Sequence, residues 1–368
     1  MKGQWIGEYT GSNQGLVIVN IDERSTFFEG VAFLNESNGQ LPSTAAFFRT
    51  TNKAKKFSFR ANLLPINPHT ALPDTWEKVR SMYSEQVNFP QYADVKGTEN
   101  DQLLKLSWTT NIGTSGQCSL PKTKAVQPSE CVSINKNWTG YKQHISKLEN
   151  RRFLFRGQSK PWRLRTSFHR TGRANLLRFL DEDIPILLKH LSAKTRHVFN
   201  LQIPDENGAF LNLVQHHGYP TPLLDWTYSP YVAAFFAYRG ISEAEAEKAG
   251  ADAKVRILIL DQQQWRADFN QVQRLIVPGP HVSICEFLAI ENDRMIPQQA
   301  ATMVTSIDDI ETYIQSRETQ GKRYLSAVDA PVRERKKVIE ELSYMGITAG
   351  SLFPGLDGAC EELRERNF

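Results

Sequence analysis

Long apolar runs and closely spaced cysteines are both missing from this sequence of 368 residues. No stretch approaches the roughly 18 apolar residues that a membrane-spanning helix requires, and the first residues lack the apolar segment of a secretory signal. The four cysteines lie far apart without a Cys-x-x-Cys pair, which argues against a disulfide framework or a zinc site. We therefore expect a cytoplasmic protein that binds neither a membrane nor a metal.

Several short catalytic motifs are missing as well. Gly-x-Ser-x-Gly, Gly-x-x-x-x-Gly-Lys-Ser/Thr and His-Glu-x-x-His do not occur, which argues against an α/β-hydrolase, a P-loop enzyme and a zinc protease. The net charge of +4 is too small to predict nucleic-acid binding by itself. One segment stands out, because residues 142–173 contain ten Lys or Arg and a single acid, Glu149. This run is typical either of a solvated basic face or of a surface that binds phosphates.

The residues that are present predict two folded domains. Hydrophobic residues make up 40% of the chain and seven are Trp, which is enough for compact cores, and the length suits two domains. The segment 121–129 has the composition of a linker. We predict an α+β protein, with a small β-rich sandwich or barrel over residues 1–130 and a mixed α+β domain over residues 131–368.

Alternating residues and glycines in the first part predict short antiparallel strands. The predicted strands are 5–11, 16–22, 27–34, 45–49, 56–60 and 103–108, with a helix over 74–86. In the second part we predict helices over 138–149, 174–199 and 231–238, and strands over 153–158, 255–260 and 282–288. Pro185 should kink or divide the second helix, and Ser229 before Pro230 should cap the third. The segment 352–358 reads as a turn.

Two separated segments carry polar side chains that a pocket could use. Residues 153–158 read Phe-Leu-Phe-Arg-Gly-Gln and deliver Arg156 and Gln158 to a strand end, beside a glycine that would let a ligand approach the backbone. The second segment, 216–230, supplies five further polar side chains: His216, His217, Asp225, Thr227 and Ser229. We predict that the two segments form the walls of one pocket.

These segments carry a family resemblance. The matching motifs are Phe-Arg-Gly-Gln at 155–158, Gln-His-His-Gly at 215–218, Thr-Pro-Leu-Leu-Asp-Trp-Thr at 221–227, Ala-Ala-Phe-Phe-Ala at 233–237, Arg-Met-Ile-Pro-Gln-Gln at 294–299 and Leu-Phe-Pro at 352–354. From about residue 138 to the C-terminus, the chain resembles the FRG domain family. The first 130 residues match no family in this way.

The order of the motifs is also similar to that of the ADP-ribosyltransferase superfamily. This resemblance implies that Arg156 grips the dinucleotide NAD and that hydroxyls and an aromatic ring hold its ribose and nicotinamide. The NAD-binding residues would be Arg156, Gln158, His216, Trp226, Thr227, Ser229 and Gln298, and the catalytic residues would be Asp225, Gln299 and His217.

A glutamate that the superfamily carries on a third strand has no counterpart here, because residues 297–304 contain Gln298 and Gln299 but no carboxylate. A glutamine can hydrogen-bond the ribose, but it cannot stabilise a positively charged transition state as an anion does. Glu286, Glu291 and Asp225 are the alternatives for that charge. We favour Gln298 or Gln299 for positioning, with Asp225 as the nearby anion.

Each of these residues also has a structural interpretation. Arg156 could form a salt bridge with Asp225, Asp225 could cap the helix near residue 229, one histidine could lie in the core, and Trp226 could be a core residue. Two functions follow from the alternatives. The chain is either an NAD-dependent ADP-ribosyltransferase-like effector (a toxin or an anti-phage protein) that modifies a protein or nucleic acid, or a non-catalytic nucleic-acid or nucleotide-binding module that uses the basic segment 142–173.

Overall fold

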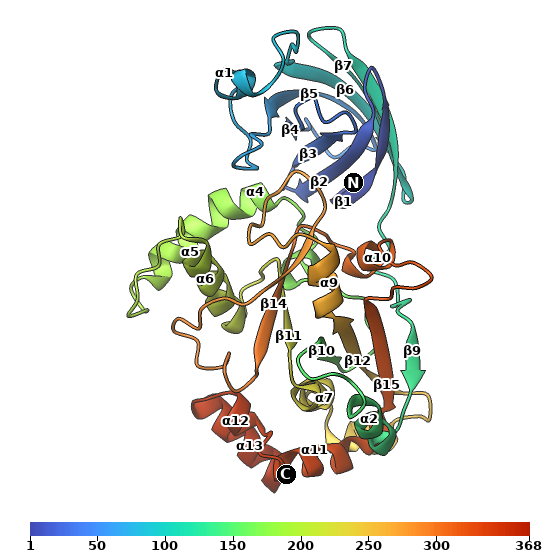
Figure 1. Ribbon diagram of the computed structural model, residues 1–368, viewed down its shortest axis with the longest axis vertical. Helices are drawn as coiled ribbons and strands as arrows, with labels where there is room; N and C mark the ends of the chain where they lie inside the picture. The colour runs from blue at the N-terminus through green and yellow to red at the C-terminus, as the bar shows by residue number, and fades with distance from the viewer.

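The computed structural model describes residues 1–368, which form a β-barrel followed by a mixed α+β part (Figure 1). The predicted α+β class with a β-rich N-terminal part is thereby confirmed, and that part is a barrel and not a sandwich. None of the helices combines the length and the apolar character needed to span a bilayer.

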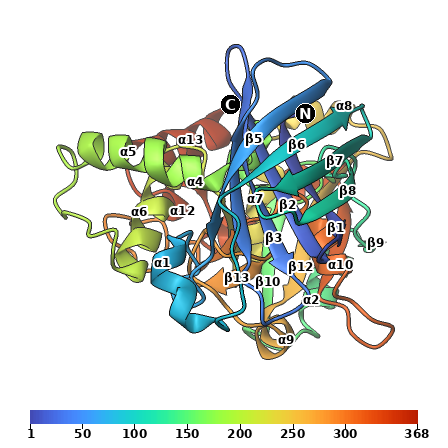
Figure 2. The ribbon, with the colours of Figure 1, turned by 90° about the horizontal axis from the view of Figure 1, so that it is seen from above.

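Eight antiparallel strands form the barrel in sequence order, and β8 pairs back onto β1 to close it. The strands are β1 (Gly3–Gly11), β2 (Gly15–Glu23), β3 (Phe28–Glu36), β4 (Thr44–Arg49), β5 (Lys56–Pro65), β6 (Tyr92–Glu99), β7 (Leu103–Thr110) and β8 (Ser115–Pro121). The helix expected over 74–86 is shorter and comprises α1 (Trp76–Val79) and η1 (Arg80–Met82). Figure 2 looks onto the barrel from above.

A seven-stranded sheet forms the centre of the second part, in the order β13-β14-β11-β10-β12-β15-β9. Its strands are β9 (Ser133–Asn135), β10 (Phe153–Gln158), β11 (Leu223–Thr227), β12 (Lys254–Asp261), β13 (Val282–Cys285), β14 (Ala300–Thr305) and β15 (Leu325–Pro331). All neighbours are antiparallel except β15 and β9, which are parallel. The strand expected over 282–288 is shorter and ends at Cys285.

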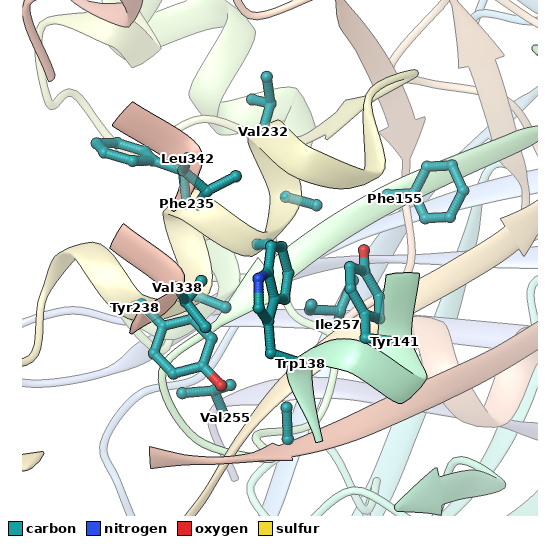
Figure 3. Close-up of a cluster of buried hydrophobic side chains, with 14 of the residues drawn as sticks. Trp138, Tyr141, Phe155, Val232, Phe235, Tyr238, Val255, Ile257, Val338 and Leu342 are labelled. Carbon is teal, nitrogen blue, oxygen red and sulfur yellow. The ribbon is translucent and has the colours of Figure 1, made fainter. Parts of the chain in front are cut away.

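Three helices cover one face of this sheet: α2 (Trp138–Ile145), α7 (Pro230–Arg239) and α11 (Arg335–Tyr344). Figure 3 shows Trp138 of α2, Val232 of α7 and Leu342 of α11 in one buried cluster with Phe155 and Ile257 of the strands. The turn expected over 352–358 is instead the junction between two helices, α12 (Ala349–Leu352) and α13 (Leu356–Asn367). These helices end the chain at the bottom of Figure 1.

The remaining helices lie on both faces of the sheet and next to the barrel. They are α3 (Ser167–Arg170), α4 (Leu176–Arg178), η2 (Phe179–Asp183), α5 (Ile184–Leu191), α6 (Pro204–His216), α8 (Glu243–Lys248), α9 (Gln262–Asp268), α10 (Ile310–Gln315) and η3 (Val332–Glu334). The predicted interruption at Pro185 is confirmed, because a π-helical turn over 179–183 precedes α5 and the proline lies in its first turn. A proline there disrupts no hydrogen bond that the helix needs.

The barrel and the second part share a hydrophobic core. Val31 and Phe33 of β3 point out of the barrel into a cluster with Phe168, Phe210 and Leu223. Beside this cluster lies Asp22, whose side chain is fully buried. Its carboxylate accepts hydrogen bonds from the backbone amides of Ala174 at 2.8 Å and Asn175 at 3.1 Å. It also pairs with Arg173 at 3.2 Å and Arg178 at 2.9 Å, so the two parts are held in one orientation.

Candidate functional site

Arg156 lies where strands β10 and β11 stop pairing. The two strands pair at one position, Phe155 opposite Thr227, whereas β10 pairs with β12 along its whole length. One step beyond that pair, the guanidinium of Arg156 donates through Nη1 to the main-chain oxygen of Asp225. The arginine thus links the two strands at the point where their own hydrogen bonds end.

Gly157 has a different role from the one predicted. We expected this glycine to let a ligand approach the backbone, but helix α7 already covers it. A Cβ at Gly157 would lie 1.9 Å from the carbonyl oxygen of Ala233 and 2.6 Å from the amide nitrogen of Ala237. The glycine after Arg156 is therefore required by the packing of α7 on the strand.

The charge of Arg156 is poorly compensated. Its Nε is enclosed and has no hydrogen-bond partner. Burial lowers the pKa of Arg156 to about 10, the charge of Asp225 opposes that shift, and the neighbouring charge of Arg170 adds to it. The side chain remains protonated at neutral pH, so it is a partly desolvated cation with a second guanidinium nearby. Such an arrangement favours the binding of an anion.

The carboxylate of Asp225 does not pair with Arg156, so the salt bridge considered above is not formed. Its Oδ1 instead accepts a hydrogen bond from Nε2 of Gln215 at the end of α6, and Oε1 of Gln215 accepts one from the hydroxyl of Thr221. Asp225 itself is exposed. Neither Gln215 nor Thr221 was predicted as a site residue, although Gln215 begins the Gln-His-His-Gly motif and could have been found there.

Thr227 and Ser229 use their hydroxyls within the fold. The hydroxyl of Thr227 donates to the main-chain oxygen of Gln298 at 2.6 Å and accepts from the amide of Ser229 at 3.0 Å. Ser229 accepts from the amide of Val232 at 3.2 Å and is the N-cap of α7, as its position before Pro230 predicted. The cap is thus Ser229 and not Asp225. The side chain of Gln298 is also engaged, since it donates to Leu352 at 2.9 Å.

His216 and His217 lie at the end of a helix. His216 is the last residue of α6, and His217 is its C-cap. Nδ1 of His216 lies 2.7 Å from the main-chain oxygen of Asn212 and 2.9 Å from the side chain of Asn292. His217 is exposed. The two histidines therefore differ, with one held by neighbours and the other facing solvent near Gln215.

Three further predicted residues make no hydrogen bond to the side chains of Arg156 or Asp225. Gln158 is buried and donates to the main-chain oxygen of Trp162 at 2.8 Å. Trp226 is 3% exposed and belongs to the core on the opposite face of the sheet from α7. Gln299 is exposed, with φ of 47°, and its main-chain oxygen accepts from the amide of Tyr228 at 3.0 Å. A positive φ is uncommon for glutamine.

The two alternative acids are both engaged. Glu286 accepts a hydrogen bond from the hydroxyl of Tyr228 and lies 3.4 Å from Arg266. Glu291 accepts from the backbone amides of Arg196 at 2.7 Å and His197 at 2.9 Å. Of the carboxylates considered from the sequence, Asp225 is the one whose carboxylate contacts the Gln-His-His-Gly motif. No group of three or more His, Cys, Asp or Glu side chains gathers in a way that could hold a metal ion.

The basic segment 142–173 does not form one free cationic face. Five of its ten cations pair with carboxylates elsewhere: Lys142 with Glu341, Arg152 with Asp261, Arg163 with Asp309, Arg165 with Asp308, and Arg173 with Asp22 and Asp183. Arg163 is 4% exposed. Half of the cations in the segment therefore form ion pairs within the fold. Arg156 and Arg170 are neighbouring guanidiniums that have no carboxylate partner.

Comparison with known proteins bears on this same segment. No curated protein and no solved structure matches the chain. A family model, that of the FRG domain, matches residues 151–246. The match includes β10, the helices α3 to α7 and strand β11, and therefore Arg156, Gln215 and Asp225. An FRG domain is present in this chain, and the polar cluster around Arg156 lies inside it.

Proposed function

We propose that the FRG domain binds NAD through Arg156 and transfers ADP-ribose to a macromolecular target. The observation that carries this proposal is the half-buried guanidinium of Arg156, whose Nε has no partner. The charge of Arg170 lies near it, and an exposed carboxylate, Asp225, belongs to the adjoining strand. Two guanidiniums suit a pyrophosphate, which accepts several charge-assisted hydrogen bonds at once.

In this proposal Asp225 acts on the ribose next to nicotinamide. The bond between C1′ of that ribose and the nicotinamide nitrogen breaks, and nicotinamide leaves with the bonding electron pair as a neutral molecule. The positive charge that develops on the ribose is stabilised by the carboxylate of Asp225, held in place by Gln215. A nucleophile of the target then bonds to C1′ and loses its proton.

Four other predicted residues have supporting roles. His217 is exposed and accepts the proton of the attacking nucleophile, while the side chain of Gln299, also exposed, donates a hydrogen bond to the ribose. The hydroxyl of Thr227 donates a hydrogen bond to the main-chain oxygen of Gln298, and the side chain of Gln298 donates one to the main-chain oxygen of Leu352. These two bonds hold the segment that carries Gln299. A cytoplasmic effector, such as a toxin or an anti-phage protein, is the biological role that we infer for such a reaction.

The experiment measures NAD binding by calorimetry and nicotinamide release in the presence of cell lysate, with the full chain. We expect Arg156→Ala to weaken NAD binding at least tenfold, since one bidentate charged contact is lost. Asp225→Asn should retain binding but lower nicotinamide release at least a hundredfold. Lys147 is another cation of segment 142–173 and has no carboxylate partner. Lys147→Gln is therefore the matched control and should change neither NAD binding nor nicotinamide release.

The outcome that contradicts the proposal is the absence of both NAD binding and nicotinamide release. A salt titration with labelled nucleic acid separates the alternative function. If nucleic acid binds, if its affinity falls with salt, and if Arg156→Ala weakens it while NAD does not bind, the domain is a phosphate-binding module without transferase activity.

A further inference from the structure

The interior of the barrel contains a cavity of about 150 Å³. Of its 33 lining residues 23 are hydrophobic, and Phe48, Phe57, Phe59 and Trp108 form much of its wall. Phe48 stacks on Phe59, with ring centroids 4.7 Å apart. An apolar cavity of roughly this size can hold one small aromatic molecule, and an eight-stranded barrel is wide enough for one small ligand.

Small residues line part of the cavity wall. Four buried alanines point inward from four adjacent strands: Ala32, Ala46, Ala61 and Ala93. They lie directly opposite one another in pairs, Ala32 with Ala46 and Ala61 with Ala93. A well-packed interior leaves few voids larger than a water molecule, so a ladder of alanines beside stacked aromatic rings keeps space open at a cost in stability.

One end of the cavity is polar. Tyr9 of β1 and Glu36 at the end of β3 both line it, and Tyr9 is 3% exposed. The hydroxyl of Tyr9 and Oε2 of Glu36 are enclosed and neither makes a hydrogen bond of good geometry. Burial raises the pKa of Glu36 against the opposing effect of the neighbouring Tyr9 and Asn13 side chains, and burial together with the neighbouring Glu36 carboxylate raises the pKa of Tyr9. Unpartnered buried polar groups are costly, and here two of them face the same apolar space.

We propose that the barrel binds a small aromatic molecule bearing one hydrogen-bond donor, with its ring against the alanine ladder and its donor directed to Glu36 and Tyr9. The apolar wall packs against the aromatic ring, and the size of the cavity limits the ligand to one or two rings. The carboxylate of Glu36 accepts the donor of the ligand. This site lies in the part of the chain outside the FRG match, and it does not depend on the proposed NAD chemistry.

Indole and indene test the proposal, because the two bicyclic molecules are close in shape and only indole carries an N–H donor. Binding to the full chain is followed by calorimetry and by the rise in melting temperature. We expect saturable binding of indole and at least tenfold weaker binding of indene, which corresponds to the loss of one hydrogen bond to a charged group. Glu36→Gln should reduce the preference for indole over indene.

The alanine ladder supplies a matched pair of variants. Ala61→Leu fills the cavity, whereas Asn62→Leu adds the same side chain at the next position, which faces outward and is exposed. Indole binding should be lost in Ala61→Leu and kept in Asn62→Leu. Should Ala61→Leu fail to fold, Ala46→Val is the smaller replacement and should weaken binding at least fivefold. The proposal is overturned if neither molecule binds saturably, if a folded Ala61→Leu binds indole like the parent chain, or if indene binds as tightly as indole.

Discussion

Gly157 and Ala233 meet backbone to backbone: a Cβ on the glycine would lie 1.9 Å from the carbonyl oxygen of the alanine. The contact joins strand β10, which carries Arg156, to helix α7, which follows the strand that carries Asp225. Because the opposing atoms belong to the main chain, no side-chain rotation can relieve a clash there. The position of Arg156 relative to the rest of the FRG domain is thus set by the absence of a side chain at its neighbour.

We expect Gly157→Ala to lower the free energy of unfolding by roughly 3 kcal/mol, since overpacking a closed contact forces backbone shifts. Urea unfolding of the two proteins measures the difference. Gly240→Ala is the control, because a Cβ at Gly240 meets nothing within 4 Å, and it should unfold like the parent chain. Equal stability of the Gly157 variant would show that α7 can move away from the strand without cost.

Asp22 should be critical for the junction between the barrel and the second part. Asp22→Ala leaves Arg173 and Arg178 without their buried partner, and breaking such a pair costs about 3–5 kcal/mol. Glu23→Gln at the next position removes an exposed pair with Lys2 and Lys53 and should cost less than about 1 kcal/mol. Thermal unfolding followed by circular dichroism compares the two, and similar melting temperatures would contradict the prediction.

Two buried histidines should make the protein less stable in mild acid. Burial lowers the pKa of His169 and of His281 from 6.5 to about 4. A histidine with a lowered pKa in the folded state binds its proton more readily when unfolded, so its stabilising contribution is complete above pH 6.5 and is lost as the pH falls towards 4. Each contributes at most roughly 3 kcal/mol over this window.

Urea unfolding at pH 7.0, 5.5 and 4.5 measures this loss. His281→Gln should show a shallower decline of the free energy of unfolding between these pH values than the parent chain does. His190→Gln, which changes an exposed histidine, should decline in parallel with the parent. If all three proteins lose the same free energy, the acid sensitivity belongs to other groups.

The cysteines should differ sharply in reactivity. Burial raises the pKa of Cys118 and Cys131 to about 12 and that of Cys285 to about 11, whereas Cys360 is exposed. Since the thiolate is the reactive form, a thiol reagent at pH 8 should label one cysteine of the folded protein and all four after denaturation. Cys360→Ser should remove the labelling of the folded state, and rapid reaction of a second thiol would contradict the burial described here.

Gln215 should position Asp225 without contacting the substrate. If the domain cleaves NAD as proposed, Gln215→Ala should lower kcat about tenfold and leave KM within a factor of two, because the carboxylate loses one hydrogen bond that orients it. Gln215→Glu, which cannot donate to a carboxylate at neutral pH, should be at least as impaired. A change confined to KM would assign the glutamine to substrate binding instead.

The parts of the fold that the sequence predicted are those where apolar residues recur regularly. The interruption of the helix near Pro185 and the cap at Ser229 before Pro230 were predicted, because proline restricts its backbone wherever it occurs. Strands β6 and β8 escaped prediction since their inward positions include Gly97 and Gly116, which lie under Phe57 and Trp108 and leave no apolar run. Helix α6 was missed although Pro204 and two acids mark its first turn.

The candidate site was predicted only in part for a related reason. Arg156 and Asp225 were expected to be neighbours, and they are, but the acceptor is a main-chain oxygen that no sequence pattern identifies. Gln215 of α6 donates to Asp225, and Thr221 in the turn that follows the helix donates to Gln215. These contacts depend on a helix that the sequence did not predict. The core location of Trp226 likewise depends on the strand alternation of β11 relative to its neighbours.

The order of strands also bears on how the chain folds during synthesis. Every barrel strand pairs with its neighbour in sequence, so the barrel needs only the first 121 residues to close. The second sheet places β10 between strands that appear about 70 and about 100 residues later, and its edge strand β9 waits for β15, which ends at residue 331. Domains generally fold as they emerge from the ribosome, so the barrel can be complete while the strands of the second sheet are still unpaired. Val31 and Phe33 would then already form a surface on which the later helices assemble.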